Sequence, residues 1–321
     1  MNDTNGSLLS CDSFLEAGAN GSLTMEDFAS GLPRWCPGCG DHSVLSAVQR
    51  LLESEGLKRE KTVFTSGIGC SSRFPHYVKA YGFHSIHGRS LPLATGLKLT
   101  RPDLDVFTVM GDGDCCSIGA GHWIHAIRYN VNMVALLLDN NIYGLTKNQT
   151  SPTTPQGHKS NTQPLGSYLP ALNPVSATLG ISNVSFVAQT ADWLPAHVYE
   201  TLRAAYHHRG FSFVRILQRC PVFTPTIFQE AVRKPQAIEL LLFEGGIRDS
   251  EVEALYQNHI QHDPSNLAEA RRLAETSDKI RLGLFYRNET NPCYDEIRRP
   301  SRHTVEEKFE ILNAELDKYA V

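Results

Sequence analysis

Two short motifs combine oxygen ligands for a metal ion with glycines that can lie against phosphate. The first is Gly111-Asp112-Gly113-Asp114, and the second is Asn140-Asn141-Ile142-Tyr143-Gly144. Mg²⁺ prefers an octahedron of oxygen ligands and is usually held by one or two protein side chains together with substrate phosphates. Asp112 and Asn140 can supply side-chain oxygens, and a main-chain carbonyl near Ile142 can supply a third. Because the glycines let backbone N–H groups approach phosphate, the motifs predict a site for a divalent metal and a diphosphate.

The apolar segments around these motifs predict a βαβ unit. Residues 104–110 and 131–138 have strand patterns, and residues 117–129 between them have a helical pattern. Parallel strands place the loops at their carboxyl ends on one edge of the sheet, which is where ligands bind in open α/β folds. Further strands near 61–66, 184–188, 212–218 and 281–286 alternate with helices near 41–55, 192–208, 265–277 and 303–319. The sequence therefore predicts a doubly wound, mostly parallel α/β sheet.

Two other interpretations of the Gly-Asp-Gly motif are weaker. A Rossmann dinucleotide fingerprint needs a third glycine at position 116, where this chain has Cys116. An acid between the glycines would also repel a pyrophosphate unless a cation lay between them. An ordinary surface turn explains the tripeptide alone, but it does not explain the paired asparagines after the next strand.

Eight cysteines form a second group of candidate ligands. The first residues, Met1-Asn2-Asp3-Thr4, lack the basic and apolar regions of a secretory signal, which favours a reducing, cytoplasmic location. Thiols in such a chain indicate metal binding or redox chemistry. Cys36-Pro37-Gly38-Cys39 has the spacing with which two thiolates hold one metal centre. Cys70 and Cys220 are the best candidates for two further ligands, because each follows a predicted strand.

The cysteine spacing fits three kinds of site. These are a structural zinc with four thiolates, a thioredoxin-like redox pair at positions 36 and 39, and an iron–sulfur cluster. Zinc sites more often combine two Cys-x-x-Cys motifs, whereas clusters accept one such motif and two isolated ligands. The spacing favours the cluster and leaves zinc open. Cys115 and Cys116, beside the diphosphate motif, are expected to be packing residues.

Composition and charge limit the remaining possibilities. A net charge of −4 argues against a nucleic-acid binder, and the longest apolar runs are of strand length, so no transmembrane helix is expected. We expect a polar arm at residues 1–32, an α/β domain carrying both sites at 33–222, and a tail at 223–321 that packs on the core or on a partner. Residues 145–175 are too long for a simple connector and are predicted to cover the active site.

Two local expectations concern helix ends. Asp41 is expected to cap a helix whose apolar face is followed by a stop at Gly56. His207 and His208 follow a predicted helix, where positive charge is favourable, and we expect them to supply it.

Taken together, the motifs resemble the beta subunits of the 2-oxoacid:ferredoxin oxidoreductases, most closely the 2-oxoglutarate type, also called 2-oxoglutarate synthase. The resemblance covers residues 33–320. It is carried by Trp35-Cys36-Pro37-Gly38-Cys39-Gly40-Asp41, Gly67-Ile68-Gly69-Cys70-Ser71-Ser72-Arg73-Phe74-Pro75, Gly82-Phe83-His84-Ser85-Ile86-His87-Gly88-Arg89, Gly111-Asp112-Gly113-Asp114, residues 140–147, Ser151-Pro152-Thr153 and Gln218-Arg219-Cys220-Pro221.

The resemblance implies a role for each motif. The ligands of one 4Fe–4S cluster would be Cys36, Cys39, Cys70 and Cys220. Asp112, Asn140 and the carbonyl of Ile142 would hold the Mg²⁺ of thiamine diphosphate in a thiamine diphosphate-binding fold. The segments implied to line that cofactor comprise Ile68, Gly69, Cys70, Ser71, His87, Gly88, Arg89, Ser90, Gly113, Asp114, Gly144 and Leu145. Among them His87 is favoured as a diphosphate contact. Lys147 matches a loop lysine that handles substrate and coenzyme A, although Asn148 follows it where glycine is expected.

The resemblance also implies a reaction. A 2-oxoacid, with 2-oxoglutarate as the expected substrate, would be decarboxylated oxidatively with coenzyme A to an acyl-CoA and carbon dioxide, and the reaction could run in both directions. Electrons would pass through the cluster to ferredoxin, a step that redox-inactive zinc could not support. An alpha subunit would complete the site, with two copies of each chain. Two alternatives remain open, a non-redox thiamine diphosphate decarboxylase with zinc and a subunit that keeps the fold but not the chemistry.

Overall fold

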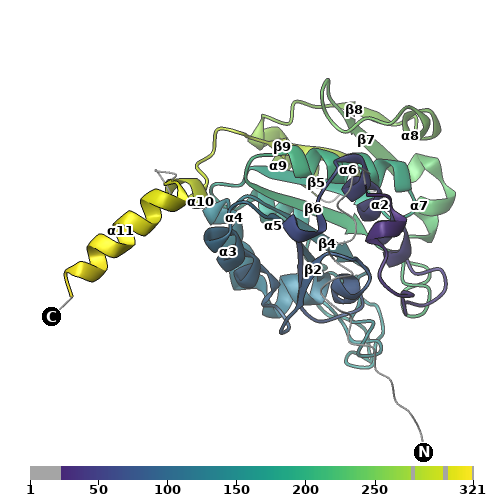
Figure 1. The fold of residues 1–321 in the computed structure, drawn as a ribbon. Coiled ribbons are helices and arrows are strands. Elements are labelled where there is room, and N and C mark those ends of the chain that lie inside the picture. The colour runs from purple at the N-terminus through teal and green to yellow at the C-terminus, as the bar shows by residue number, and fades with distance from the viewer. Residues whose placement is uncertain (1–22, 276–278, 299–302, 320–321) are drawn as a thin grey trace, which may run out of the picture.

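A nine-stranded sheet forms the centre of the computed structural model, which describes residues 23–275, 279–298 and 303–319 (Figure 1). The strands lie in the order β2-β1-β3-β4-β6-β5-β9-β7-β8, and every neighbouring pair is parallel except β5 with β9. Their bounds are β1 Thr62–Ser66, β2 Tyr81–His84, β3 Asp105–Gly111, β4 Met133–Asp139, β5 Phe186–Ala191, β6 Phe211–Leu217, β7 Ile238–Leu242, β8 His259–Gln261 and β9 Ile280–Arg287. The mostly parallel α/β sheet predicted from the sequence is confirmed.

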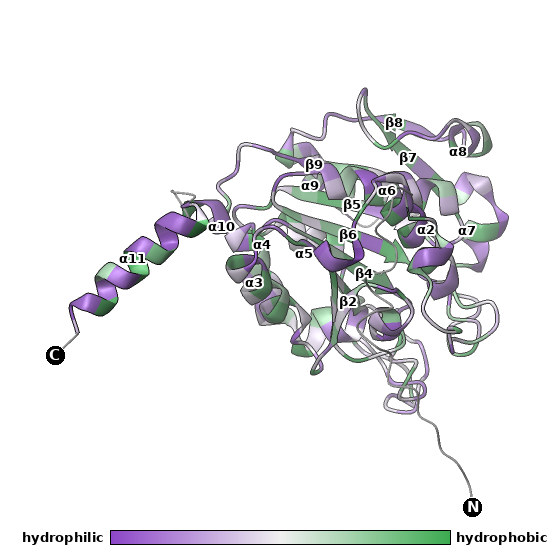
Figure 2. Ribbon diagram, viewed as in Figure 1, coloured by the Kyte–Doolittle hydropathy of each residue, from purple (hydrophilic) through white to green (hydrophobic). Residues whose placement is uncertain are grey.

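Helices cover both faces of this sheet. The α-helices are α2 Asp41–Ser54, α3 Ser90–Thr100, α4 Ala120–Tyr129, α5 Pro174–Leu179, α6 Pro195–His207, α7 Gln229–Arg233, α8 Ser250–Leu255, α9 Leu267–Ala274, α10 Tyr294–Ile297 and α11 Val305–Asp317. Short 3₁₀ turns occur at Glu26–Phe28, Arg59–Lys61, Ser71–His76 and Pro235–Ala237, and a π-helix spans Asp114–Ile118. Figure 2 shows hydrophobic residues along the central strands, as expected for strands buried on both faces.

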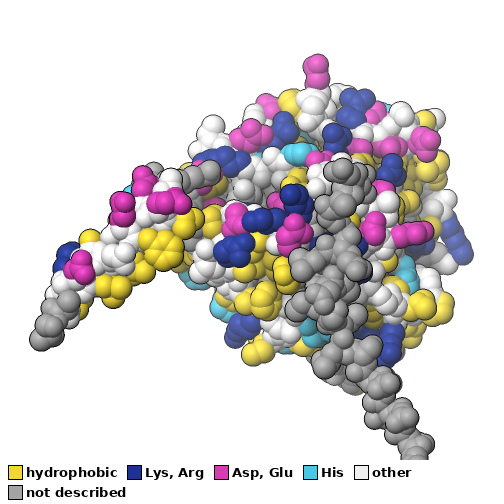
Figure 3. Space-filling model, in the orientation of Figure 1, with side chains coloured by type: hydrophobic (Ala, Val, Ile, Leu, Met, Phe, Trp, Pro, Cys, Tyr) yellow, Lys and Arg dark blue, Asp and Glu magenta, His cyan; other side chains and the backbone are white. Residues whose placement is uncertain are grey.

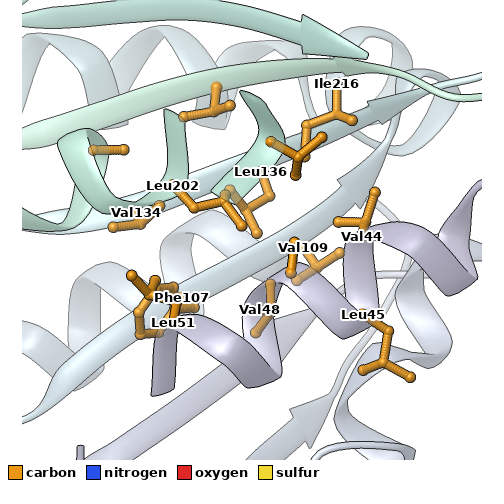
Figure 4. Packing of buried hydrophobic residues seen from close by; sticks show 14 of the residues in the cluster. Val44, Leu45, Val48, Leu51, Phe107, Val109, Val134, Leu136, Leu202 and Ile216 are labelled. Carbon is orange, nitrogen blue, oxygen red and sulfur yellow. The ribbon is translucent and has the colours of Figure 1, made fainter. Parts of the chain in front are cut away.

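Alternate residues of β4 enter two different cores, one on each side of the sheet. Val134 and Leu136 pack with α2 and α6, as Figure 4 shows around Val48 and Leu202. Ala135 and Leu137 belong to the opposite core, with residues of α3, α4, α5 and α9. The period of two in a strand produces this division. The same burial on both faces explains why the strand reads as a continuous apolar run in the sequence.

The register of the central strands brings together the two motifs that are predicted to bind a metal and a diphosphate. Gly111 at the end of β3 pairs with Leu138 of β4, so the residues after each strand leave the sheet at neighbouring points. Asp112 follows the first strand directly, and Asn140 follows the second. Both motifs therefore lie at the carboxyl edge of adjacent parallel strands, as the βαβ prediction required.

Residues beyond position 222 contribute to the same sheet. Strand β9 pairs antiparallel with β5, and β7 and β8 continue the sheet from β9. Helix α11 instead projects away from the body of the protein (Figure 1). The division of the chain at residues 32 and 222 stays a prediction, and most of the proposed arm, residues 1–22, lies outside the described residues.

Two expectations about helix ends were wrong. Gly40, not Asp41, is the N-cap of α2, and no side chain caps this end of the helix. His208 follows α6 but is buried, and burial lowers its pKa to about 4, so it carries no positive charge at neutral pH. His207 alone lies by an acidic partner, 3.1 Å from Glu55.

Candidate active site

A cavity of about 140 Å³ lies beyond the carboxyl ends of β3 and β4, and we call it the diphosphate cavity after the ligand predicted for it. Its lining combines the loops after β1, β3 and β4 with one residue after β2. The lining residues are Ile68, Gly69, Cys70, Ser71, His87, Gly111, Asp112, Gly113, Asp114, Leu138, Asn140, Ile142, Tyr143, Gly144, Leu145 and Thr146. All three residues predicted to bind Mg²⁺ are among them, and most of the residues predicted to line thiamine diphosphate are there too.

Asp112 is a buried carboxylate held by two hydroxyl groups. Ser151 donates a hydrogen bond to Asp112 Oδ2, and Thr153 Oγ1 lies 2.7 Å from the same oxygen. Burial and the neighbouring Asp139 raise the pKa of Asp112. Asp139 is compensated by Arg215, 2.6 Å away, whereas Asp112 has no cationic partner among the described residues. A bound cation would supply the positive charge that Asp112 lacks.

Asn140 is fixed by its own loop. Its Oδ1 accepts a hydrogen bond from the backbone N–H of Ile142 at 3.1 Å, and its main-chain carbonyl accepts one from the Thr224 hydroxyl at 3.0 Å. The next residue, Asn141, adopts a left-handed backbone with φ of 62° and donates its side-chain amide to the Thr153 carbonyl. These contacts fix the turn from which Asn140 and Ile142 line the cavity.

Asp114 joins the loops after β1 and β2 to the loop after β3. Its Oδ1 accepts hydrogen bonds from the backbone N–H groups of Ile68 at 3.1 Å and Gly88 at 2.7 Å. His87 Nδ1 lies 2.6 Å from the same oxygen, which leaves Nε2 for a ligand in the cavity. Gly67 is required here, because an added Cβ would lie 2.2 Å from Asp114 Oδ2. Burial raises the pKa of Asp114.

Gly113 allows Tyr143 to close one side of the cavity. A Cβ on Gly113 would lie 2.1 Å from the Tyr143 ring, and the Tyr143 hydroxyl donates a hydrogen bond to the Gly113 carbonyl at 3.0 Å. The aromatic ring therefore packs directly on the peptide backbone of the diphosphate motif. Glycine at position 113 is a steric requirement of this contact.

The four cysteines predicted to bind the cluster line a second cavity, of about 360 Å³, which we call the cysteine cavity. Cys36 and Cys39 come from the loop before α2, Cys70 from the loop after β1, and Cys220 from the loop after β6. Gln218 donates its amide to Cys39 Sγ at 3.3 Å, and the backbone N–H of Phe223 donates to Cys220 Sγ at 3.5 Å. Burial raises the pKa of Cys70 to about 12 and raises that of Cys39 as well.

The two cavities are adjacent. Cys70, Asn140, Gly144 and Leu145 line both of them. The cysteine cavity has room for a group of several atoms, but no three His, Cys, Asp or Glu residues of the described chain converge in the way that a single metal ion requires. Positive charge at this site would offset the cost of ionising the partly buried thiols of Cys39 and Cys70.

Lys147 lies at the cysteine cavity and not at the diphosphate cavity. Lys147 and Asn148 both have left-handed backbones, with φ of 71° and 67°. Asparagine tolerates this conformation better than most residues, so Asn148 can replace the glycine expected there. The backbone N–H of Lys147 donates to the Gly144 carbonyl at 3.0 Å and closes the turn.

Three residues predicted to line the cofactor do not line the diphosphate cavity. Gly88 contributes only its N–H to Asp114, and Ser90 is buried at the start of α3. Arg89 is exposed and directs its guanidinium to the carbonyls of Gly88 and Ile118, at 3.2 and 3.3 Å. Of the segment 87–90, therefore, only His87 lines the cavity, and Gly88 contributes indirectly by donating its N–H to Asp114.

Several site residues were not identified from the sequence. The missed cavity residues are Leu138, Tyr143 and Thr146, and the missed contacts to Asp112 are those of Ser151 and Thr153. Ser151 and Thr153 lie in the long segment 145–173, which contains no helix or strand apart from a bridge at Gln149. This segment also lines a larger cavity of about 1230 Å³ that reaches His87 and Tyr143.

Comparison with protein-family models places the fold in a known class. Residues 67–216 match the model described as thiamine pyrophosphate enzyme, C-terminal TPP binding domain. Residues 251–303 match a model for the C terminal part of the beta chain of pyruvate ferredoxin oxidoreductase. The first match contains both motifs that are predicted to bind a metal, and the second covers all but the first residue of α8 together with β8, α9, β9 and α10. The fold and site are those of a thiamine diphosphate-binding domain.

Individual relatives define the family more closely. The chain is 36% identical to the 2-oxoacid:ferredoxin oxidoreductase subunit beta of Sulfolobus sp. over 82% of this chain and 84% of that protein. It is 50% identical to the 2-oxoglutarate oxidoreductase subunit KorB of Mycobacterium tuberculosis over 68% of this chain, and spans 58% of that relative. A solved 2-oxoglutarate:ferredoxin oxidoreductase from Magnetococcus marinus, with 2-oxoglutarate, coenzyme A and succinyl-CoA bound, superposes with a TM-score of 0.77 at 35% identity. That match covers 91% of this chain and 96% of the solved chain.

This chain belongs to the family of 2-oxoacid:ferredoxin oxidoreductase beta subunits, and it resembles the 2-oxoglutarate type.

Proposed function

We propose that this chain carries the thiamine diphosphate and one 4Fe–4S cluster of a 2-oxoglutarate:ferredoxin oxidoreductase. The enzyme would convert 2-oxoglutarate and coenzyme A to succinyl-CoA and carbon dioxide, would pass electrons to ferredoxin, and could run in reverse. The observation that carries this proposal is the shared wall of the two cavities, where Cys70 lines both. An electron donor and an electron acceptor bound in these cavities would be neighbours.

The diphosphate cavity fits Mg²⁺ and thiamine diphosphate. Asp112 is buried without a cationic partner among the described residues, and Asn140 and Ile142 offer further oxygens beside it. The glycines of the motif keep side chains away from the space where phosphate would lie. Hard oxygen ligands of this kind suit Mg²⁺. We therefore assign Asp112, Asn140 and the Ile142 carbonyl as its protein ligands.

The cysteine cavity fits a 4Fe–4S cluster. Four thiols from three separate loops line it, and amide groups of Gln218 and Phe223 donate to two of the sulfur atoms. Hydrogen bonds to the sulfur atoms and burial tune the potential of a cluster. A cluster, unlike zinc, can accept single electrons. We assign Cys36, Cys39, Cys70 and Cys220 as the four ligands.

Bound thiamine diphosphate supplies carbanion chemistry at the keto carbon, and the cluster supplies one-electron oxidation. The chain's own residues position and shield the reactants. His87, with Nδ1 on Asp114, can direct Nε2 at a phosphate oxygen. Tyr143 packs over Gly113 and closes one wall of the cavity. Lys147 lies at the cysteine cavity, where its cation can attract an anionic substrate or coenzyme A.

The proposal includes partners and a location. An alpha subunit would bind the aminopyrimidine end of the cofactor, giving an assembly with two copies of each chain, and ferredoxin would accept the electrons. Within the described residues, no helix combines the length and apolar character needed to cross a membrane. We place the enzyme in the cytoplasm, where a reducing environment keeps thiols available as ligands.

Two variants, one in each cavity, test this assignment in the complex purified without oxygen, and iron content and thiamine diphosphate binding are measured in both. Cys220→Ala should lower iron content and visible absorption while thiamine diphosphate still binds. Asp112→Asn should weaken thiamine diphosphate binding while iron content stays normal. Cys293→Ala is the control, because this buried free cysteine lies outside both cavities. Full iron in the Cys220 variant, or zinc in place of iron in the unaltered protein, would refute the cluster.

A further inference from the structure

Helix α11 is exposed along its whole length. None of its residues is buried, and it projects from the body of the protein (Figure 1). Figure 3 shows its hydrophobic side chains gathered on one side, with acidic side chains on the other. The exposed apolar side chains include Val305 at 62%, Phe309 at 61%, Leu312 at 51%, Leu316 at 58% and, just after the helix, Tyr319 at 81%. We call these five residues the α11 seam.

The spacing of the seam is that of a coiled coil. Successive members are separated by four, three, four and three positions. Apolar residues at alternating intervals of four and three form the a and d positions of a heptad, which pair with a second helix. A helix that merely packs on a globular core has a broader apolar face.

The seam needs a partner for the helix to be stable. The start of α11 has a capping box between Thr304 and Glu307, and Lys318 pairs with Glu315 near its end. These contacts add only tenths of a kcal/mol to about 1 kcal/mol each. Isolated helices shorter than roughly 12–15 residues are marginal in water, and α11 has 13 residues. Neither family model that matches this chain extends beyond residue 303.

We propose that α11 pairs antiparallel with α11 of a second copy of this chain. In that arrangement Phe309 meets Leu312 of the second copy, and Val305 meets Leu316 of the second copy. Because the pairing has two-fold symmetry, each of these two contacts occurs twice. Val305, Phe309, Leu312 and Leu316 of each helix therefore form one continuous apolar contact. Such self-complementary packing is expected for a two-fold interface.

The charges beside the seam select the antiparallel orientation. Lys308 and Glu315 occupy equivalent flanking positions of successive heptads, and antiparallel pairing puts Lys308 of one helix near Glu315 of the other, twice. Parallel pairing would instead place Lys308 near Asn313 and leave Glu315 without a cation across the interface. Lys308 has no ion-pair partner among the residues that the structure describes.

The area of the contact indicates its role. A pair of 13-residue helices buries less than the roughly 1,200 Å² typical of stable interfaces, so it would strengthen an assembly held by other contacts too. The pairing thus joins two copies of this chain within a larger complex. The argument rests on α11 alone and does not depend on the proposed cofactors.

Co-capture of two differently tagged copies tests the pairing in the full complex. Wild-type copies should be captured together. K308E with K308E, or E315K with E315K, should reduce capture roughly three- to tenfold, because like charges then meet twice. K308E with E315K should restore capture, because both cross-helix pairs are then opposite in charge. E310K, on the face away from the seam, is the matched control.

A second variant tests the seam itself. F309E/L312E should reduce co-capture at least as much as the single charge variants do, and its effect on folding is expected to be small because both side chains are exposed in the chain. Unchanged capture with this variant would overturn the proposal, since α11 would then contribute nothing to the association of the two copies. Loss of capture in the single charge variants without recovery in the K308E and E315K mixture would also overturn it, because α11 would then dock on a different surface, such as another subunit.

Discussion

Thr153 Oγ1 lies 2.7 Å from Asp112 Oδ2 and also 2.7 Å from Asp139 Oδ1. One hydroxyl proton is thus shared between two buried carboxylates. Arg215 neutralises Asp139, so the net charge of the two carboxylates depends on whether a cation lies beside Asp112. The long segment after β4 therefore takes part in holding the proposed metal ligand.

Thr153→Val should weaken Mg²⁺-dependent binding of thiamine diphosphate by about ten- to a hundredfold, as expected when a partner of a metal ligand is lost. Valine has nearly the same shape and removes only the hydroxyl. Thr153→Ser keeps that hydroxyl and is the control. Calorimetry of cofactor binding at several Mg²⁺ concentrations checks the result. Equal affinity in the valine and serine variants would mean that the hydroxyl does not position Asp112.

Gly113→Ala should impair cofactor binding more than Gly144→Ala. A Cβ at position 113 would lie 2.1 Å from the Tyr143 ring, whereas the nearest atom to a Cβ at position 144 is 3.6 Å away. The first substitution must displace Tyr143 or the diphosphate motif, and the second makes only ordinary contacts. The affinity for thiamine diphosphate and the intrinsic tyrosine fluorescence can be compared in the two variants. Similar affinities would show that the Tyr143 packing is adaptable.

The sequence predicted the central strands and the cysteine and metal motifs because these depend on local pattern. The buried strand β4 is continuously apolar, and Asp112 and Asn140 directly follow strands. Strand β2 escaped prediction because all four of its residues are exposed and show no alternation of burial. Asp114 begins a π-helix, and its side chain accepts hydrogen bonds from two distant loops. No local signal encodes those contacts.

The contacts of Ser151 and Thr153 could not be derived for a similar reason. They reach Asp112 from a segment without regular structure, across 39 and 41 positions of the chain. The environment of His208 depended on tertiary structure in the same way. The sequence placed it at a helix end, whereas the fold buries it against Ser185, 3.0 Å from the imidazole Nε2.

Burial of His208 predicts loss of stability in acid. Burial lowers its pKa to about 4, below the value of about 6.5 expected in the unfolded chain. The unfolded chain therefore binds a proton first, and the stability that the neutral imidazole contributes is lost as the pH falls from about 6.5 towards 4. His208→Gln should reduce this pH dependence by about one proton relative to the unaltered chain. Urea unfolding of both proteins between pH 4 and 7 measures the two slopes, and equal slopes would contradict the assignment.

The isolated chain should be inactive. The diphosphate cavity holds residues for the metal and phosphate end of thiamine diphosphate, but it has a volume of only about 140 Å³. The larger cavity beside it, lined by residues 149–152, Thr154 and residues 167–173 among others, is open and has space for a surface from another chain. Thiamine enzymes need a carboxylate near the aminopyrimidine ring, and the proposed alpha subunit would supply that group.

Reconstitution with the alpha subunit tests this dependence. The purified chain, loaded with iron, Mg²⁺ and thiamine diphosphate under anaerobic conditions, should show little reduction of a dye acceptor with 2-oxoglutarate and coenzyme A. Addition of the alpha subunit should raise the rate by at least about a hundredfold, the order of magnitude that general acid–base catalysis supplies. Pyruvate in place of 2-oxoglutarate tests the substrate in the same assay. Substantial turnover by the chain alone would show that its active site is complete without a partner.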